Sequence, residues 1–149
     1  MGEFTAEVVA KFHPEKNEWE VLETFFFCTE EGDTLMVPKG FLTDLASTKN
    51  APGFPRDDVY NQAAILHDYL YASEIFPRKI CDDIFKEALN SIDEVKKWRI
   101  PIMYFFVRVF GGFTYKEHTK DSIANNRRLA NIRNTVDKPL WKDGIARFI

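Results

Sequence analysis

The sequence predicts an α+β domain, in which a small N-terminal antiparallel β-meander precedes a helical hairpin and two further helices. Residues 4–37 contain short runs of aromatic and β-branched residues, separated by the turn-like stretches HPEKNE and TEEGD. From about residue 59 the apolar residues recur at three-to-four spacing, as on one face of a helix. The 149 residues, 45% of them hydrophobic, suffice for one core. We therefore expect a single domain over 1–149.

The expected elements follow in order along the chain. Strands are expected within residues 4–12, 19–27 and 34–37. Residues 38–58 hold three prolines and two glycines without a sustained period, which predicts a long functional loop. Four helices are expected in the helical part, about 59–134. The first runs from Val59 to the break at FPRK, and the second, from Ile80 to Leu89, forms a hairpin with it. The third runs from Trp98 to Phe110 and ends at Gly111-Gly112, and a polar fourth covers about 118–133. The tail, 135–149, is expected to pack as an irregular strap.

Charge and hydropathy exclude several classes of protein. The 20 basic and 23 acidic side chains are interspersed and give a formal charge of -3, so the chain lacks the basic surface that nucleic-acid binding requires. The most apolar stretch, IPIMYFFVRVFGGF, is too short to span a membrane and contains Arg108. No secretory signal opens the sequence. Cys28 and Cys81 lie far apart in apolar segments, which predicts two free thiols.

The stretch AAILHDYLY, residues 63–71, places a histidine and an aspartate inside an apolar helix. His67 and Tyr71 share one face, and Asp68 points about 100° away from it. The hairpin brings Asp82, near the start of the second helix, toward that face. We expect the Asp82 carboxylate to accept the Nδ1 hydrogen of His67 and the Tyr71 hydroxyl, which leaves Nε2 to take a proton from water. Asp68 is then placed to bind a hard cation such as Ca²⁺ with carbonyl oxygens of the long loop.

Each of these residues also has a structural interpretation. A single histidine in an apolar helix is usually a hydrogen-bonded core residue, and aspartates near helix starts are often caps. The set as a whole favours a functional site, because burial of several ionisable groups near one another is costly unless they pair. Asp83 is expected to face solvent. His13 and His118 have no metal-ligand spacing to His67.

Four stretches, VPKGFLTDLAST, AAILHDYLY, CDDIFKEAL and YFFVRVFGGF, occur in an order that resembles a family of small phage and bacterial proteins, domain of unknown function 1353. The resemblance runs from about Val37 to Phe113. It implies a phage or prophage source, which suits a location in the host cytoplasm or in the virion, and it brings little established activity. Asp44 and Ser47 are the polar residues of the loop motif GFLTDLAS. They either approach the His67 site or act as a local staple and cap of the loop.

The pair HDYLY and CDDIF is also similar to the helix pair of phospholipase A2. This resemblance implies a water-activating base at His67, a calcium carboxylate at Asp68, and a histidine-orienting aspartate at Asp82 with Tyr71 behind it. The glycine-rich calcium loop and the disulfides of the secreted enzymes have no counterpart in this sequence. Asp44 is the loop carboxylate that would compensate as a second metal ligand.

Two functions of different classes therefore stay open. The first is a phospholipase A2-like hydrolase in which His67 activates water, a cation at Asp68 stabilises the oxyanion, and an ester such as a lipid is cleaved. The alternative is a non-catalytic virion component or host-directed accessory protein, with a phage or host protein as partner and a structural His-Asp network. A third function, phosphohydrolase chemistry at a His-Asp metal site, has less support than these two, because the additional histidines that such enzymes use are absent. An open cleft at His67 favours the enzyme, and a sealed cluster favours the structural role.

The aromatic helix, 98–110, leaves little polar surface on any face. We expect it to be buried through most of its circumference. An exposed apolar patch would instead indicate a lipid-interface or partner-docking surface.

Overall fold

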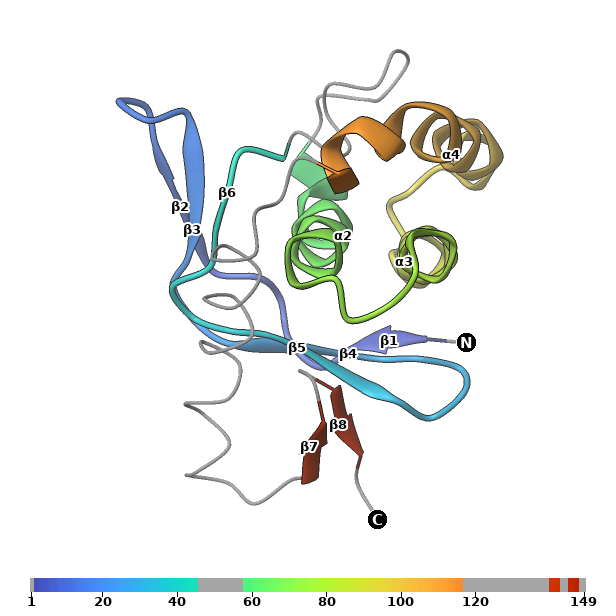
Figure 1. The fold of residues 1–149 in the computed structure, drawn as a ribbon, viewed down its shortest axis with the longest axis horizontal. Coiled ribbons are helices and arrows are strands. Elements are labelled where there is room, and N and C mark those ends of the chain that lie inside the picture. Colours follow the sequence, from blue (N-terminus) through green and yellow to red (C-terminus); the bar gives the residue numbers. More distant parts are fainter. Residues whose placement is uncertain (1, 46–57, 117–139, 143–144, 148–149) are drawn as a thin grey trace.

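The computed structural model describes residues 2–45, 58–116, 140–142 and 145–147. Within these ranges the chain forms two antiparallel sheets and three α-helices, with the helices gathered on one side of the sheets (Figure 1). The predicted α+β class is confirmed. The single-domain prediction stays a prediction.

The strands divide between a five-stranded and a three-stranded sheet. The five-stranded sheet has the order β1 (Glu3–Phe4), β4 (Phe25–Cys28), β5 (Thr34–Val37), β8 (Ile145–Arg147) and β7 (Leu140–Lys142). The three-stranded sheet has the order β2 (Ala10–His13), β3 (Glu18–Val21) and β6 (Leu42–Thr43). All described strand pairs are antiparallel, and β2–β3 and β4–β5 are hairpins joined by short turns.

The pairing refines one prediction and corrects another. The predicted N-terminal antiparallel strands are confirmed, but the run 19–27 breaks into β3 and β4, which belong to different sheets. Residues of the expected loop then return to β3: the Val21 N–H donates to the Phe41 carbonyl at 2.9 Å, and the Gly40 N–H donates to the Val21 carbonyl at 2.8 Å. The expectation of an irregular tail is wrong for residues 140–142 and 145–147, which form β7 and β8, and β8 pairs with the edge of β5 that β4 leaves open.

The helices match the predicted hairpin more closely. A 3₁₀ turn, η1 (Asp58–Tyr60), leads into α2 (Asn61–Ser73), and α3 (Arg78–Ser91) follows after a short connection. A second 3₁₀ turn, η2 (Lys97–Arg99), opens α4 (Ile100–Lys116). The expected end at Gly111-Gly112 is wrong, because α4 continues through both glycines, each of which costs only about 1 kcal/mol in a helix. The predicted helix at 118–133 lies outside the described residues.

Helix α2 occupies the centre of the fold. It contacts α3, α4 and β6, and every residue of it except Gln62 is buried. Figure 1 shows α2 between β6 on one side and α3 on the other, above the five-stranded sheet. Because this helix has almost no solvent face, any polar side chain on it must find a partner inside the protein. His67 and Asp68 are thereby carried into the interior.

Two further sequence predictions, the free thiols and the buried aromatic helix, have different outcomes. Cys28 and Cys81 are both free thiols, as predicted, and burial raises the pKa of the Cys81 thiol to about 12. The expected burial of the aromatic helix is wrong on one face, where Phe105 is 60% exposed. That face turns away from α2 and α3, because the packed face of α4 carries Met103 and Val107.

The turn between α2 and α3 depends on a strained residue. Glu74 ends α2 with φ 47° and ψ 35°, in the left-handed region, and its N–H donates to the Tyr71 carbonyl at 3.3 Å. A β-carbon in this conformation costs about 1–2 kcal/mol, and glycine avoids that cost. Part of the gain is offset, because glycine also raises the conformational entropy of the unfolded chain. We expect Glu74→Gly to raise the free energy of unfolding by about 0.5–1 kcal/mol in urea titrations. Glu74→Ala keeps the β-carbon and should give no gain; a gain equal to that of glycine would contradict the strain.

Candidate active site

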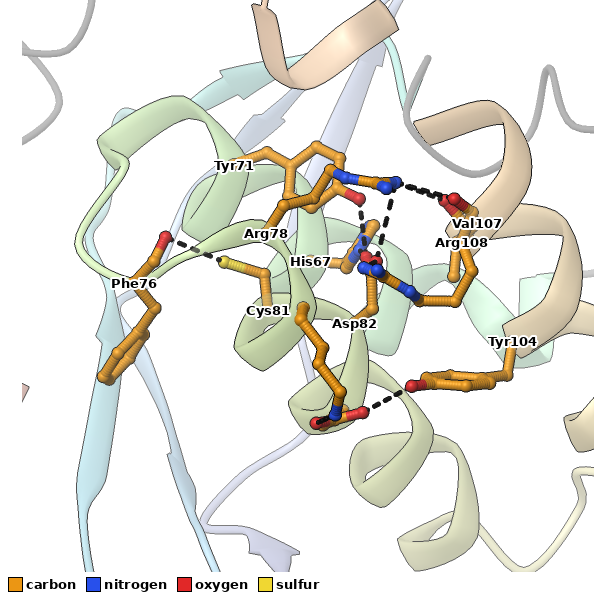
Figure 2. Close-up of polar contacts among 11 residues, drawn as sticks. His67, Tyr71, Phe76, Arg78, Cys81, Asp82, Tyr104, Val107 and Arg108 are labelled. Atoms are coloured by element: carbon orange, nitrogen blue, oxygen red, sulfur yellow. Dashed lines mark hydrogen bonds and ion pairs between the residues drawn. The ribbon is translucent and has the colours of Figure 1, made fainter. Parts of the chain in front are cut away.

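Three hydrogen bonds converge on the Asp82 carboxylate in α3 (Figure 2). Oδ1 accepts from His67 Nε2 at 2.7 Å and from the Tyr71 hydroxyl at 2.5 Å. Oδ2 accepts from Arg108 Nη1 at 2.7 Å. The side chains of His67 and Asp82 are both 0% exposed. The predicted meeting of His67, Tyr71 and Asp82 is therefore confirmed.

The nitrogen that makes this contact differs from the prediction. A carboxylate only accepts hydrogen bonds, so Nε2 of His67 carries the hydrogen and Nδ1 of the neutral ring carries the lone pair. The expectation that Nδ1 would bind Asp82 and leave Nε2 for water is wrong. Nε2 lies at the far end of the ring, and in this hairpin only that end reaches across from α2 to α3.

Aromatic neighbours shield the His67 ring from solvent. Its centroid lies 4.2 Å from that of Tyr71 and 4.7 Å from that of Phe85. Burial lowers the pKa of His67, and the hydrogen bond to Asp82 offsets only part of that effect. The ring is therefore neutral at pH 7. Burial together with the Asp82 bond also holds the pKa of Tyr71 well above its ordinary value, so this hydroxyl remains a donor.

Two arginines that the sequence analysis did not assign to the site complete the cluster. Arg108 comes from α4, and its bond to Asp82 raises its pKa further. Arg78 donates from Nη1 to the carbonyl oxygens of Arg108 at 2.8 Å and Val107 at 3.3 Å, and the same atom lies 3.9 Å from Asp82 Oδ2. The available signal was Arg108 itself, since a lone arginine in an apolar helix requires a buried acceptor.

Asp68 lies on a different face of α2 and points toward β6. Its Oδ2 accepts a hydrogen bond from the Thr43 hydroxyl, whose oxygen also accepts from the Leu45 N–H at 3.0 Å. Leu45 is fully buried with φ 61°, so this bond holds a left-handed residue in place. Thr43, which the sequence analysis did not single out, thus fastens the start of the loop to α2. Asp44 has an exposed side chain, and Ser47 lies outside the described residues.

A set of cation ligands and an opening to His67 are the two features that a calcium-dependent hydrolase site would need. Among them, no group of three or more His, Cys, Asp or Glu side chains could hold a metal ion. A groove of about 290 Å³ lies between the β4–β5 turn and α3, and its lining includes Glu30, Asp83 and Glu87 but no residue of the Asp82 cluster. His67, Tyr71 and Asp82 are fully buried, which is the arrangement that favours a structural role, whereas Arg78 and Arg108 at the edge of the cluster are partly exposed.

The fold and the site together define a class of protein. It is an α+β domain in which three helices meet at a buried cluster of His, Asp, Tyr and Arg side chains. The chain belongs to the family described as protein of unknown function (DUF1353), whose model matches residues 19–107. The match includes His67, Tyr71, Arg78 and Asp82, and it ends one residue before Arg108. No curated protein and no solved structure matches the chain. The part of the chain that the structure describes has no helix long and apolar enough to cross a membrane.

Removal of the central carboxylate should be strongly destabilising. Asp82→Ala leaves the Arg108 charge and two buried donors without their acceptor, so we expect the free energy of unfolding to fall by about 3–5 kcal/mol. Asp83→Ala is the matched control. Its side chain is 44% exposed and accepts hydrogen bonds from Lys79 and from the Tyr104 hydroxyl, and the change should cost less than about 1 kcal/mol. Urea unfolding of both variants measures the difference, and equal losses would contradict a central role for Asp82.

The lowered pKa of His67 predicts a stability profile with a definite sign. The folded protein binds a proton at His67 less readily than the unfolded chain does, so this contribution is present above the ordinary pKa of 6.5 and is lost as the pH falls below it. We expect the free energy of unfolding to decline between about pH 7 and pH 5, and to decline less in His67→Asn. His13→Asn removes a histidine outside the cluster and is the control, because a loss that both variants reduced equally would contradict the assignment to His67.

Proposed function

We propose that this chain is a hydrolase in which His67 is the general base and an ester is the substrate. The observation that gives this proposal its main support is the tautomer of His67. Its hydrogen bond to Asp82 places the hydrogen on Nε2 and the lone pair on Nδ1. A histidine that is neutral at pH 7, with its other nitrogen oriented by a carboxylate, has the properties that a general base requires. Asp82 and Tyr71 are positioning residues in this proposal.

The reaction follows from these roles. Nδ1 of His67 takes a proton from water as the water oxygen forms a bond to the ester carbonyl carbon. The tetrahedral intermediate then breaks its bond to the alcohol oxygen, and His67 returns the proton to that oxygen. The products are a carboxylic acid and an alcohol, and the histidine regains its starting form. The Asp82 carboxylate stabilises the imidazolium that exists between the two proton transfers.

Calcium stays a prediction of the phospholipase A2 resemblance. The described residues supply one buried carboxylate at the expected position, Asp68, and this group already accepts the Thr43 hydroxyl. They do not by themselves make a cation site, so no step of the reaction is assigned to a metal. If Asp68 and Asp44 hold Ca²⁺, EDTA should lower the activity and Asp68→Asn should reduce the dependence on calcium.

A second function is favoured by a specific observation, the complete burial of His67, Tyr71 and Asp82. In this alternative the protein is a non-catalytic phage virion component or host-directed accessory protein, and the cluster fixes the positions of three helices. The two functions differ in access, since catalysis requires water and substrate to reach Nδ1 of His67. Modification with diethyl pyrocarbonate, read by mass spectrometry, measures that access, with the partly exposed His13 as an internal reference.

The deciding experiment compares activity with stability. His67→Asn keeps a hydrogen-bond donor for Asp82 but removes the base, so it should reduce hydrolysis by about 10²- to 10⁴-fold while the protein stays folded. Asp82→Asn should reduce activity less, because it changes only the orientation of the ring. The assay is release of fatty acid from mixed phospholipid vesicles and of p-nitrophenol from its esters, with and without calcium.

Thermal melts of the same proteins are the control. Wild type that is inactive on every ester tested, together with lower melting temperatures for His67→Asn and Asp82→Asn, would remove the hydrolase and leave the structural function. Activity that persists at wild-type level in His67→Asn would also contradict the proposal, since another group would then be the base.

A further inference from the structure

An apolar stripe runs along the solvent face of η2 and α4. Its members, spaced four, three and four residues apart, are Trp98, Ile102, Phe105 and Val109. They are 64%, 44%, 60% and 51% exposed. This spacing places them on one side of the helix, opposite the packed residues Ile100, Met103 and Val107. Figure 1 shows α4 at the outer edge of the helical layer, away from both sheets.

The segment that carries the stripe is basic on balance. The sequence from Asp93 to Lys116 contains five basic residues and two acidic ones, Asp93 and Glu94 at its start, although the whole chain has a net charge of -3. Three of the basic residues flank Trp98, and the Arg99 guanidinium lies 5.2 Å from the centre of the Trp98 ring. Lys97 donates to carbonyl oxygens of Asn90 and Ile92 at the end of α3. Lys96 and Arg99 are therefore the cations best placed to meet a partner.

An apolar stripe beside a group of cations is complementary to a surface with an apolar interior and anionic groups at its edge. The interface of a bilayer that contains anionic lipids has this character, and tryptophan is enriched there because its ring is amphipathic. A second copy of the chain fits less well. A symmetric pair that buried the stripe would bring two basic segments toward each other, and like charges oppose such a contact.

We propose that η2 and α4 bind the surface of an anionic bilayer. The stripe lies among the acyl chains near the headgroups, and Lys96 and Arg99 contact lipid phosphates. The helix lies in the plane of the interface, as expected for an amphipathic segment that does not span the membrane. The proposal does not depend on the proposed hydrolysis, because it concerns binding alone.

Flotation of the full chain with vesicles tests this directly. We expect wild type to float with phosphatidylcholine vesicles that contain one third phosphatidylglycerol, to float much less with pure phosphatidylcholine, and to be released by high salt. Phe105→Asp should lower the partition coefficient about tenfold or more, since one inserted aromatic side chain is replaced by a charge. Lys96→Gln should lower it about fivefold on the anionic vesicles.

A matched control comes from the other side of the molecule. Phe12 in β2 is also an exposed apolar residue, 41% exposed, and lies outside the stripe. Phe12→Asp should leave flotation unchanged, and circular dichroism should show that all variants are folded. Absence of wild-type flotation on anionic vesicles would overturn the proposal, as would equal losses in Phe12→Asp and Phe105→Asp. A dimer in light scattering that Phe105→Asp dissociates, without vesicle binding, would assign the stripe to a second copy.

Discussion

A carboxylate that is cut off from water, Asp82, sets how the three helices are placed. An ion inside a protein costs several kcal/mol unless donors converge on it with good geometry. Here the donors come from both neighbouring helices, His67 and Tyr71 from α2 and Arg108 from α4. A shift of either helix away from α3 would leave a charge or a donor unsatisfied. The cluster therefore acts as a geometric constraint, and Arg78 extends it to the backbone of α4.

The same central helix is held on its other side by a second polar contact. Asp68 follows His67 directly, but the helical turn aims it at β6, where it accepts the Thr43 hydroxyl. Two adjacent polar residues thus connect α2 to the helical layer and to the three-stranded sheet. This explains why a helix with almost no solvent face contains an ionisable pair, since each member has its own partner in a different layer.

Local periodicity explains what the sequence could predict. His67, Tyr71 and Asp82 meet because helical spacing and a short hairpin leave few alternatives, and both features are visible along the chain. Arg108 and the pairing of β8 with β5 depend on contacts between distant segments, about which local patterns say nothing. The choice of Nε2 over Nδ1 depends on the separation of α2 and α3. Thr43 was missed because a single threonine next to a loop has no periodic signal.

The histidine itself is the part of the cluster that a purely structural role explains least. Without it, Asp82 would still receive the Tyr71 hydroxyl on Oδ1 and Arg108 on Oδ2, so its charge would remain compensated. A leucine or phenylalanine at position 67 would pack beside Phe85 with no polar atom to satisfy, and such replacements in cores are often neutral or stabilising. Histidine adds a group that can bind and release a proton between about pH 5 and pH 8, which leucine and phenylalanine cannot do. Proton transfer explains that choice of residue, and this is the basis on which we propose His67 as the general base.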